Sequence, residues 1–167
     1  LAMLLAFNST IPGLPIIYYG DEIGIPGGGD PDNRRPMYFT GLSEHETENL
    51  ATTQKLGQLR SQFLPFIYGD FTFLKIEQKI LVYSRKYFEE FAIVYFNKTR
   101  ETQTIEVTLP QHVDYSELQS FSQCRYYLRN SQLFVEIPAM CFEIIYHKLP
   151  EKTTPSSTVI HYEDFLD

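Results

Sequence analysis

The sequence predicts an α/β part followed by an all-β part: a short helix–strand–helix segment over residues 1–67, then an antiparallel β-sandwich over residues 68–149. In the first part, two helical apolar patterns flank one apolar run of the kind found in buried strands. From Phe71 onward apolar residues recur at every second position, which is typical of strands with one buried face. Residues 150–167 are rich in Thr, Ser, Pro and acidic residues, so we expect a linker or a mobile tail there.

Within the first part, residues 1–7 are apolar on nearly all sides and predict the end of a buried helix, which Pro12 and Gly13 stop. Residues 14–19 are apolar or aromatic and predict a strand buried on both faces, as in a parallel sheet. A glycine-rich polar loop follows, at the strand end where α/β folds place their active sites. A second helix is expected to begin at the capping box Ser43–Glu46 and to end at Pro65 and Gly69.

The second part contains a series of short strands with no helical pattern between them. The predicted strands are 71–76, 79–84, 91–96, 104–109, 125–129, 132–137 and 141–147. The run 91–96 is almost continuously apolar and is expected to be central. Asn130 and Ser131 are expected to form a short turn between two of the strands. Such a series predicts an antiparallel sandwich or barrel.

Composition excludes several classes of partner. A net charge of −7, with Lys and Arg not clustered, disfavours nucleic acid, and no apolar stretch is long enough to predict a membrane partner. The chain starts inside a helical pattern and is too short for a complete eight-stranded α/β barrel, so we expect a fragment of a longer polypeptide. Cys124 and Cys141 are expected to be small buried apolar residues, although a disulfide between them remains an alternative.

Candidate site residues lie in the loop after the predicted strand. Adjacent residues at a strand end point to opposite sides, so we expect Asp21 and Glu22 to be structural rather than a catalytic pair. Asp30 and Arg34 offer an acceptor and a donor that can bind sugar hydroxyls. The alternative is an ion pair that stiffens the loop. A calcium loop is disfavoured because Arg34 occupies a ligand position.

Other candidates are weaker. The aromatic residues Tyr126, Tyr127 and Phe134 are expected to pack in the core, with a sugar platform on the sandwich as the alternative. The four histidines share no ligand spacing, so no metal site and no cofactor are expected; they are His45, His112, His147 and His161.

Two segments carry a family resemblance. The residues Ile11-Pro-Gly-Leu-Pro-Ile-Ile-Tyr-Tyr-Gly-Asp-Glu-Ile-Gly24 and Asp30-Pro-Asp-Asn-Arg-Arg-Pro-Met37 resemble the last barrel strand, and the loop after it, of the α-amylase family of glycoside hydrolases. The resemblance implies the last strand and helix of a (β/α)8 barrel followed by an antiparallel β-sandwich. In relatives that resemble cyclomaltodextrinases, neopullulanases and maltogenic amylases, the residues matching Asp30 and Arg34 contact the glucan. The family's catalytic Asp, Glu and Asp lie on earlier barrel strands and have no counterpart here, so no catalytic residue is assigned.

The resemblance implies the C-terminal part of an α-glucan-acting hydrolase, in which the whole enzyme cleaves α-glucosidic bonds with retention. Its expected partners are an α-glucan or maltooligosaccharide substrate and the missing N-terminal barrel of the same polypeptide. Without the catalytic acids the chain alone is expected to be inactive. Two alternatives remain: a non-catalytic sandwich module that binds carbohydrate or a partner, and part of a transglycosylase of the same family.

Overall fold

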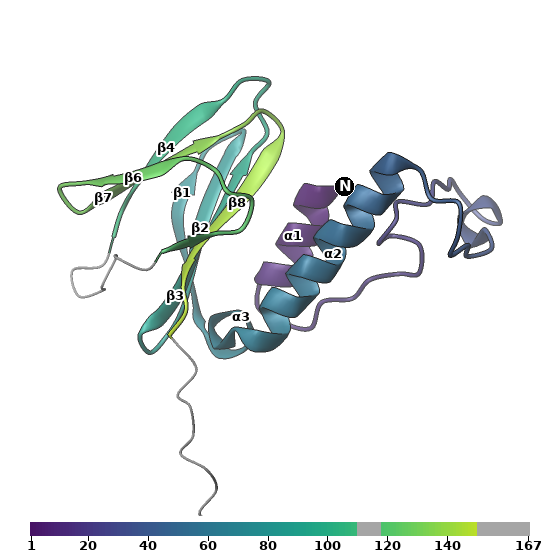
Figure 1. Cartoon of the computed structure of the whole chain (residues 1–167), viewed down its shortest axis with the longest axis horizontal. Coiled ribbons are helices and arrows are strands. Elements are labelled where there is room, and N and C mark those ends of the chain that lie inside the picture. Colours follow the sequence, from purple (N-terminus) through teal and green to yellow (C-terminus); the bar gives the residue numbers. More distant parts are fainter. Residues whose placement is uncertain (110–117, 150–167) are drawn as a thin grey trace, which may run out of the picture.

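A layer of helices lies against one side of a two-sheet β-sandwich in the computed structural model, which describes residues 1–109 and 118–149 (Figure 1). The helices are α1 (Ala2–Thr10), the 3-10 turn η1 (Asp32–Arg34), α2 (Glu44–Gln62) and α3 (Leu64–Tyr68). The strands are β1 (Asp70–Ile76), β2 (Ile80–Tyr87), β3 (Glu90–Asn97), β4 (Gln103–Thr108), β5 (Gln119–Ser120), β6 (Tyr126–Arg129), β7 (Gln132–Ile137) and β8 (Cys141–His147). The expected tail, His112 and His161 lie outside the described residues.

The strands form two antiparallel sheets, which confirms the predicted sandwich. The larger sheet has the order β1-β2-β3-β8-β5, and the smaller has the order β4-β7-β6. The run 91–96 lies in β3 at the centre of the larger sheet, as its composition predicted. The sequence did not predict β5, which has only two residues. Buried Glu143 helps to hold it, because the Ser120 hydroxyl donates to the Glu143 carboxylate at 3.1 Å.

Two hydrophobic cores explain why β3 is apolar at successive positions. Ile93 and Tyr95 belong to the core between the two sheets, whereas Ala92 and Val94 belong to a second core between the larger sheet and the helices. Strands whose two faces are both covered lose the alternation of apolar and polar residues. The helices contribute four buried residues to the second core, Leu5, Ala6, Leu56 and Phe66, and Phe63 joins them from the junction between α2 and α3.

The segment 14–19 was predicted to be a buried strand, and this prediction is wrong for the chain as it stands. The segment forms no strand, and Leu14 and Ile16 are 90% and 80% exposed. A strand of a parallel sheet needs neighbours on both edges for its backbone groups. No strand of the described residues lies beside this segment. Its apolar side chains therefore remain in solvent.

The helix boundaries were predicted in part. Ser43 and Glu46 form the predicted capping box at the start of α2. The helix ends at Gln62, however, and Pro65 lies in the first turn of α3 rather than ending α2. Proline is tolerated in a first turn because the backbone N–H groups there have no acceptor within the helix. At the first helix, Leu5 is buried but Leu4 is 72% exposed, so that helix is covered on one side only.

Buried polar side chains from α2 and the sandwich hold the end of α1. The Arg60 Nη1 group donates to the Ser9 carbonyl oxygen, and Arg85 Nη1 donates to the Thr10 carbonyl oxygen, both at 2.7 Å. The hydroxyls of Thr10 and Tyr83 are 2.5 Å apart. Cations are favourable at a helix C-terminus, where the carbonyl groups lack partners. These contacts fix the point at which the loop with the candidate site residues begins.

Candidate functional site

Asp30 and Arg34 lie together on the surface of the loop that follows α1. Arg34 Nε is 2.8 Å from Asp30 Oδ1, and the two side chains are 69% and 61% exposed. The structure therefore brings together the two residues that the sequence singled out. An ion pair this exposed contributes little to stability because water screens both charges.

A second ion pair orders the same turn. Arg35 Nη2 lies 2.7 Å from Asp32 Oδ1, and the Gly28 N–H donates to Asp32 Oδ2 at 2.9 Å. The Gly28 N–H and the Arg35 guanidinium hold the pKa of Asp32 below its ordinary value, because both stabilise the ionised carboxylate. Asp32 thus ties together the two ends of the turn on which Asp30 and Arg34 lie.

A cavity of about 220 Å³ lies beside this turn. Its lining residues are Tyr18, Tyr19, Asp21, Ile25, Pro26, Gly27, Asn33 and Arg35. The rings of Tyr18 and Tyr19 are tilted against each other with centroids 4.5 Å apart, and the hydrogen bond between their phenols raises the pKa of Tyr19. Aromatic faces next to planar polar groups provide the contacts that sugars need. The sequence carried no signal that Asn33 and Arg35 would line a cavity, because that depends on how the loop folds back.

Asp21 and Glu22 are not arranged as a catalytic pair. Glu22 Oε2 accepts a hydrogen bond from the Gly20 N–H at 2.7 Å and so stabilises the turn, while Asp21 lines the cavity. Glycoside hydrolysis needs two carboxyl groups that face one bond. The two side chains have different environments and do not meet this requirement.

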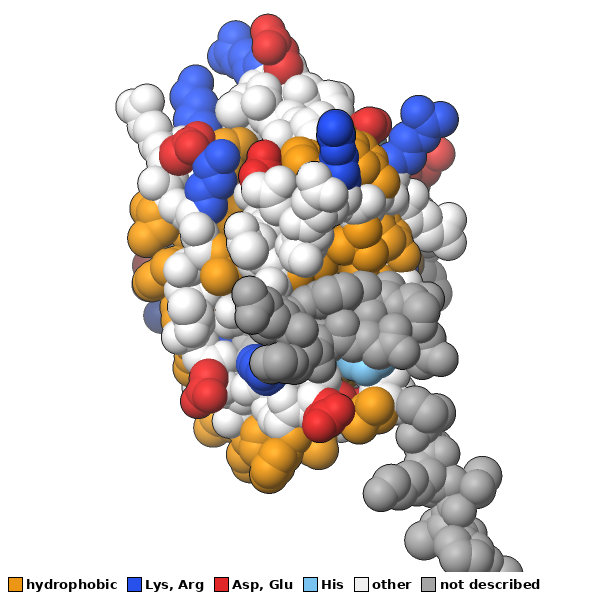
Figure 2. All heavy atoms as spheres, turned by 90° about the vertical axis from the view of Figure 1, so that its left-hand side faces the viewer, with side chains coloured by type: hydrophobic (Ala, Val, Ile, Leu, Met, Phe, Trp, Pro, Cys, Tyr) orange, Lys and Arg blue, Asp and Glu red, His pale blue; other side chains and the backbone are white. Residues whose placement is uncertain are grey.

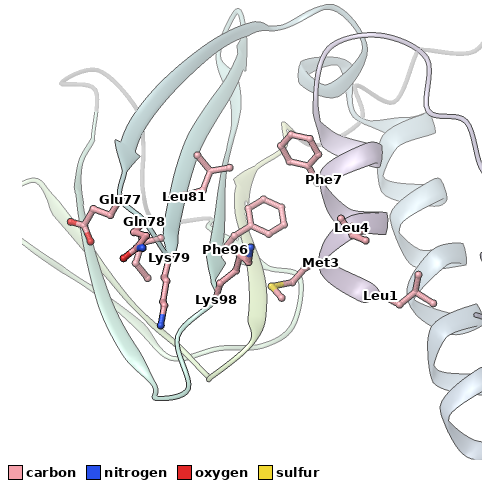
Figure 3. A pocket seen from close by; sticks show the side chains of 11 residues that line it. Leu1, Met3, Leu4, Phe7, Glu77, Gln78, Lys79, Leu81, Phe96 and Lys98 are labelled. Atoms are coloured by element: carbon pink, nitrogen blue, oxygen red, sulfur yellow. The ribbon is translucent and has the colours of Figure 1, made fainter.

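A larger hollow of about 420 Å³ lies between α1 and the β1–β2 end of the larger sheet (Figure 3). In Figure 3, Phe7 and Met3 extend from α1 toward Phe96, and Lys79 and Lys98 lie at the rim. The wall is mainly apolar. Its polar lining residues, Glu77, Gln78, Lys79 and Lys98, all lie at or beside the β1–β2 turn, so only one end of the hollow is polar. We therefore assign no chemistry to it.

The remaining candidates separate into buried and exposed residues. Tyr126 packs against the core between the sheets and donates from its hydroxyl to the Leu118 carbonyl oxygen at 2.7 Å, as core packing predicts. For Tyr127 and Phe134 that expectation is wrong, because the two rings stack on each other on the outer face of the small sheet and belong to neither core. Cys124 and Cys141 are free, partly buried thiols, and burial raises the pKa of Cys124 to about 12.

His45 is exposed on α2, whereas His147 is buried against Phe91. Within residues 1–109 and 118–149, no group of three or more His, Cys, Asp or Glu side chains is placed to share a metal ion. No helix in the same part of the chain is long and apolar enough to cross a membrane.

Comparison with known proteins gives this arrangement a family. Residues 69–134 match the model of the alpha-amylase C-terminal domain. The cyclomaltodextrinase of Geobacillus thermopakistaniensis (strain MAS1) is 33% identical over 110 residues, which are 65% of this chain and 18% of that protein. The cyclomaltodextrin glucanotransferase of Bacillus sp. (strain 38-2) is 35% identical over 104 residues, 61% of this chain and 14% of the relative. The chain thus spans less than a fifth of these relatives.

Solved structures agree over most of the chain, helices included. The α-amylase of Geobacillus thermoleovorans complexed with acarbose superposes with a TM-score of 0.75 at 32% identity, over 91% of this chain and 33% of that one. An Anoxybacillus α-amylase superposes with a TM-score of 0.77 at 28% identity, over 87% of this chain and 31% of that one. Fold and comparisons define a C-terminal β-sandwich domain preceded by a fragment of a barrel. More narrowly, residues 69–134 carry the C-terminal domain of the α-amylase family.

Proposed function

We propose that the chain is the C-terminal part of an enzyme that cleaves α-glucosidic bonds in α-glucans with retention of configuration. In this proposal residues 1–67 complete the catalytic barrel, residues 68–149 form the sandwich domain, and residues 150–167 are a linker or tail. Asp30 and Arg34 bind the substrate. The remainder of the barrel, an earlier part of the same polypeptide, supplies the catalytic acids.

The exposed Asp30–Arg34 pair is the observation that carries the proposal. Among the described residues, their contact uses one carboxylate oxygen and the Nε group. Asp30 Oδ2 and the two terminal nitrogens of Arg34 are then available to sugar hydroxyls, which both accept and donate hydrogen bonds. The adjacent cavity, with Tyr18 and Tyr19 in its wall, offers aromatic surface to the same ligand.

The relatives support an α-glucan or a maltooligosaccharide as the ligand. The α-amylase of Geobacillus thermoleovorans was solved with acarbose bound, and the cyclomaltodextrinase is named for a cyclic glucan. Retaining cleavage requires a nucleophilic carboxylate and an acid/base carboxyl on opposite sides of one bond. Asp21 and Glu22 do not provide that pair, which is why the proposal places both catalytic groups upstream.

The test is substrate binding by Asp30→Ala and Arg34→Ala, each made in the full-length protein. Both variants are expected to bind maltooligosaccharide more weakly and to keep their melting temperature, because neither side chain is buried. Lys75→Ala is the matched control, since Lys75 forms a surface ion pair with Glu77 in another part of the chain. If both loop variants melt several degrees lower and bind normally, the pair stiffens the loop and does not serve the substrate.

A transglycosylase of the same family is the second candidate. The observation in its favour is the 35% identity to a cyclomaltodextrin glucanotransferase, which is no lower than the identity to the cyclomaltodextrinase. Product analysis separates the two reactions, because a hydrolase releases linear sugars whereas transfer within one chain gives cyclic ones.

A further inference from the structure

The outer face of the small sheet has an aromatic centre. Tyr127 on β6 and Phe134 on β7 are direct cross-strand partners. Their rings stack with centroids 5.0 Å apart and an interplanar angle of 8°. Tyr127 is 50% exposed, and β6 is an edge strand. The pair therefore presents aromatic surface to solvent on a face that neither core uses.

Polar side chains surround this pair in a regular pattern. The next cross-strand row contains Arg129, Gln132 and Thr108, and Glu106 lies beside Phe134 on the other side from Tyr127. Gln132 donates a hydrogen bond to Glu106, which fixes the orientation of both planar groups. Figure 2 looks onto this side of the molecule and shows hydrophobic side chains interspersed with charged ones.

We propose that this face binds an α-glucan chain, with a glucose ring against Tyr127 and hydroxyls bonded to Arg129, Gln132 and Glu106. The site is separate from the loop with Asp30 and Arg34. The identity of the ligand rests on the proposed function, whereas the position of the site rests on the geometry of the sheet. On this basis the sandwich holds the polymer while a different part of the enzyme cleaves it.

The chemistry of the face favours a neutral polyhydroxyl ligand. Arg125 and Arg129 on the β6 side are balanced by Glu106 and Glu136 on the neighbouring strands, two positive charges against two negative ones. A balanced rim gives no net attraction to a charged polymer. It does provide donors and acceptors for hydroxyl groups at the distances set by strand spacing.

The size of the aromatic surface argues against a protein partner. A stable protein interface buries about 800 Å² on each side, whereas one aromatic side chain buries only about 150–250 Å². Two stacked rings, one of them half exposed, provide far less than such an interface requires. The area is instead suited to one or two sugar rings. Stabilisation of the sheet alone is the competing explanation, because cross-strand aromatic pairs stabilise antiparallel sheets.

A reporter variant tests binding in the chain itself. The sequence contains no tryptophan, so Tyr127→Trp places a single indole at the proposed site and keeps an aromatic ring there. Titration with maltoheptaose is expected to give a saturable fluorescence change. Tyr68→Trp is the matched control, because Tyr68 is an exposed tyrosine that also contacts another aromatic ring, that of Tyr87. A change of the same size in both variants, or in neither, overturns the proposal.

Affinity measurements separate this site from the loop. Loss of one aromatic contact raises a dissociation constant about two- to tenfold. Tyr127→Ala is therefore expected to bind maltoheptaose that much more weakly, whereas Tyr68→Ala is expected to bind it with the affinity of the parent chain. The double variant Asp30→Ala/Arg34→Ala is expected to keep this binding. If only the loop variant loses binding, the sandwich site is wrong and the proposed function stands. If Tyr127→Ala fails to fold, the reporter titration still decides.

Discussion

The contact between Tyr83 and Thr10 joins the sandwich to the helix that leads into the candidate site. Thr10 donates its hydroxyl hydrogen to the Ala6 carbonyl oxygen at 2.7 Å, so Tyr83 must be the donor in the bond between the two hydroxyls. Tyr83 has no exposed surface. Tyr83→Phe removes this hydrogen bond and leaves no cavity. At about pH 8 we expect it to lower the free energy of unfolding by about 1 kcal/mol.

The same variant is expected to become the more stable protein at high pH. Burial raises the pKa of Tyr83 from 10.0 to about 12, and the charge of nearby Arg85 acts in the other direction. Between these values the unfolded chain loses the phenol proton and the folded chain retains it. Stability is therefore fully present below pH 10 and falls as pH rises, by about 3 kcal/mol in total for two pKa units. From roughly pH 11 this loss exceeds the stabilisation by the hydrogen bond. Above that pH, Tyr83→Phe should have the higher free energy of unfolding of the two proteins.

Urea unfolding followed by circular dichroism measures both effects, at about pH 8 and about pH 11.5. Tyr68→Phe is the matched control, because it removes an exposed phenol. We expect the free energy of unfolding of Tyr68→Phe to differ from that of the parent chain by the same small amount at both pH values. If Tyr83→Phe is less stable than the parent by an equal margin at both values, ionisation of Tyr83 is not linked to folding and the reasoning fails.

Three further predictions follow from burial and from the proposed function. Asn97→Ala should lower the free energy of unfolding by about 2–4 kcal/mol in urea titrations, because the buried Asn97 amide nitrogen shares its two hydrogens among three backbone carbonyl oxygens; a loss below about 1 kcal/mol would contradict its role. Backbone amides should exchange hydrogen slowly in residues 91–96 and fast in residues 14–19. Slow exchange of residues 14–19 in a monomer would contradict this, because it would mean that the segment packs against the sandwich or the helices. The purified chain should release no reducing sugar from starch; turnover above a blank would place catalytic acids within it.

The sequence by itself determined the strands of the sandwich except β5, together with one turn between them and the start of one helix. Alternation marked β4 and β7 of the smaller sheet, because a strand with one buried face must alternate, whereas a continuous apolar run marked β3 of the larger sheet. Ser43 and Glu46 located the start of α2 through a local pair of hydrogen bonds. Asn130 and Ser131 located a turn whose positive φ angles of 51° and 64° asparagine tolerates well. The sequence singled out Asp30 and Arg34 by residue type for sugar binding, with an ion pair between them as the alternative, and the structure shows them in contact.

Only the tertiary structure decided which apolar segments are covered and which polar ones are buried. Residues 14–19 have the composition of a buried strand, but burial depends on neighbouring strands that the described residues do not supply. Arg60 and Arg85 look like surface cations in sequence, yet both are buried where α1 ends, because the helix leaves carbonyl groups there that need donors. Tyr127 faces solvent because β6 belongs to the uncovered side of the sandwich. Each of these outcomes depends on contacts between residues far apart in the chain, which local patterns do not encode.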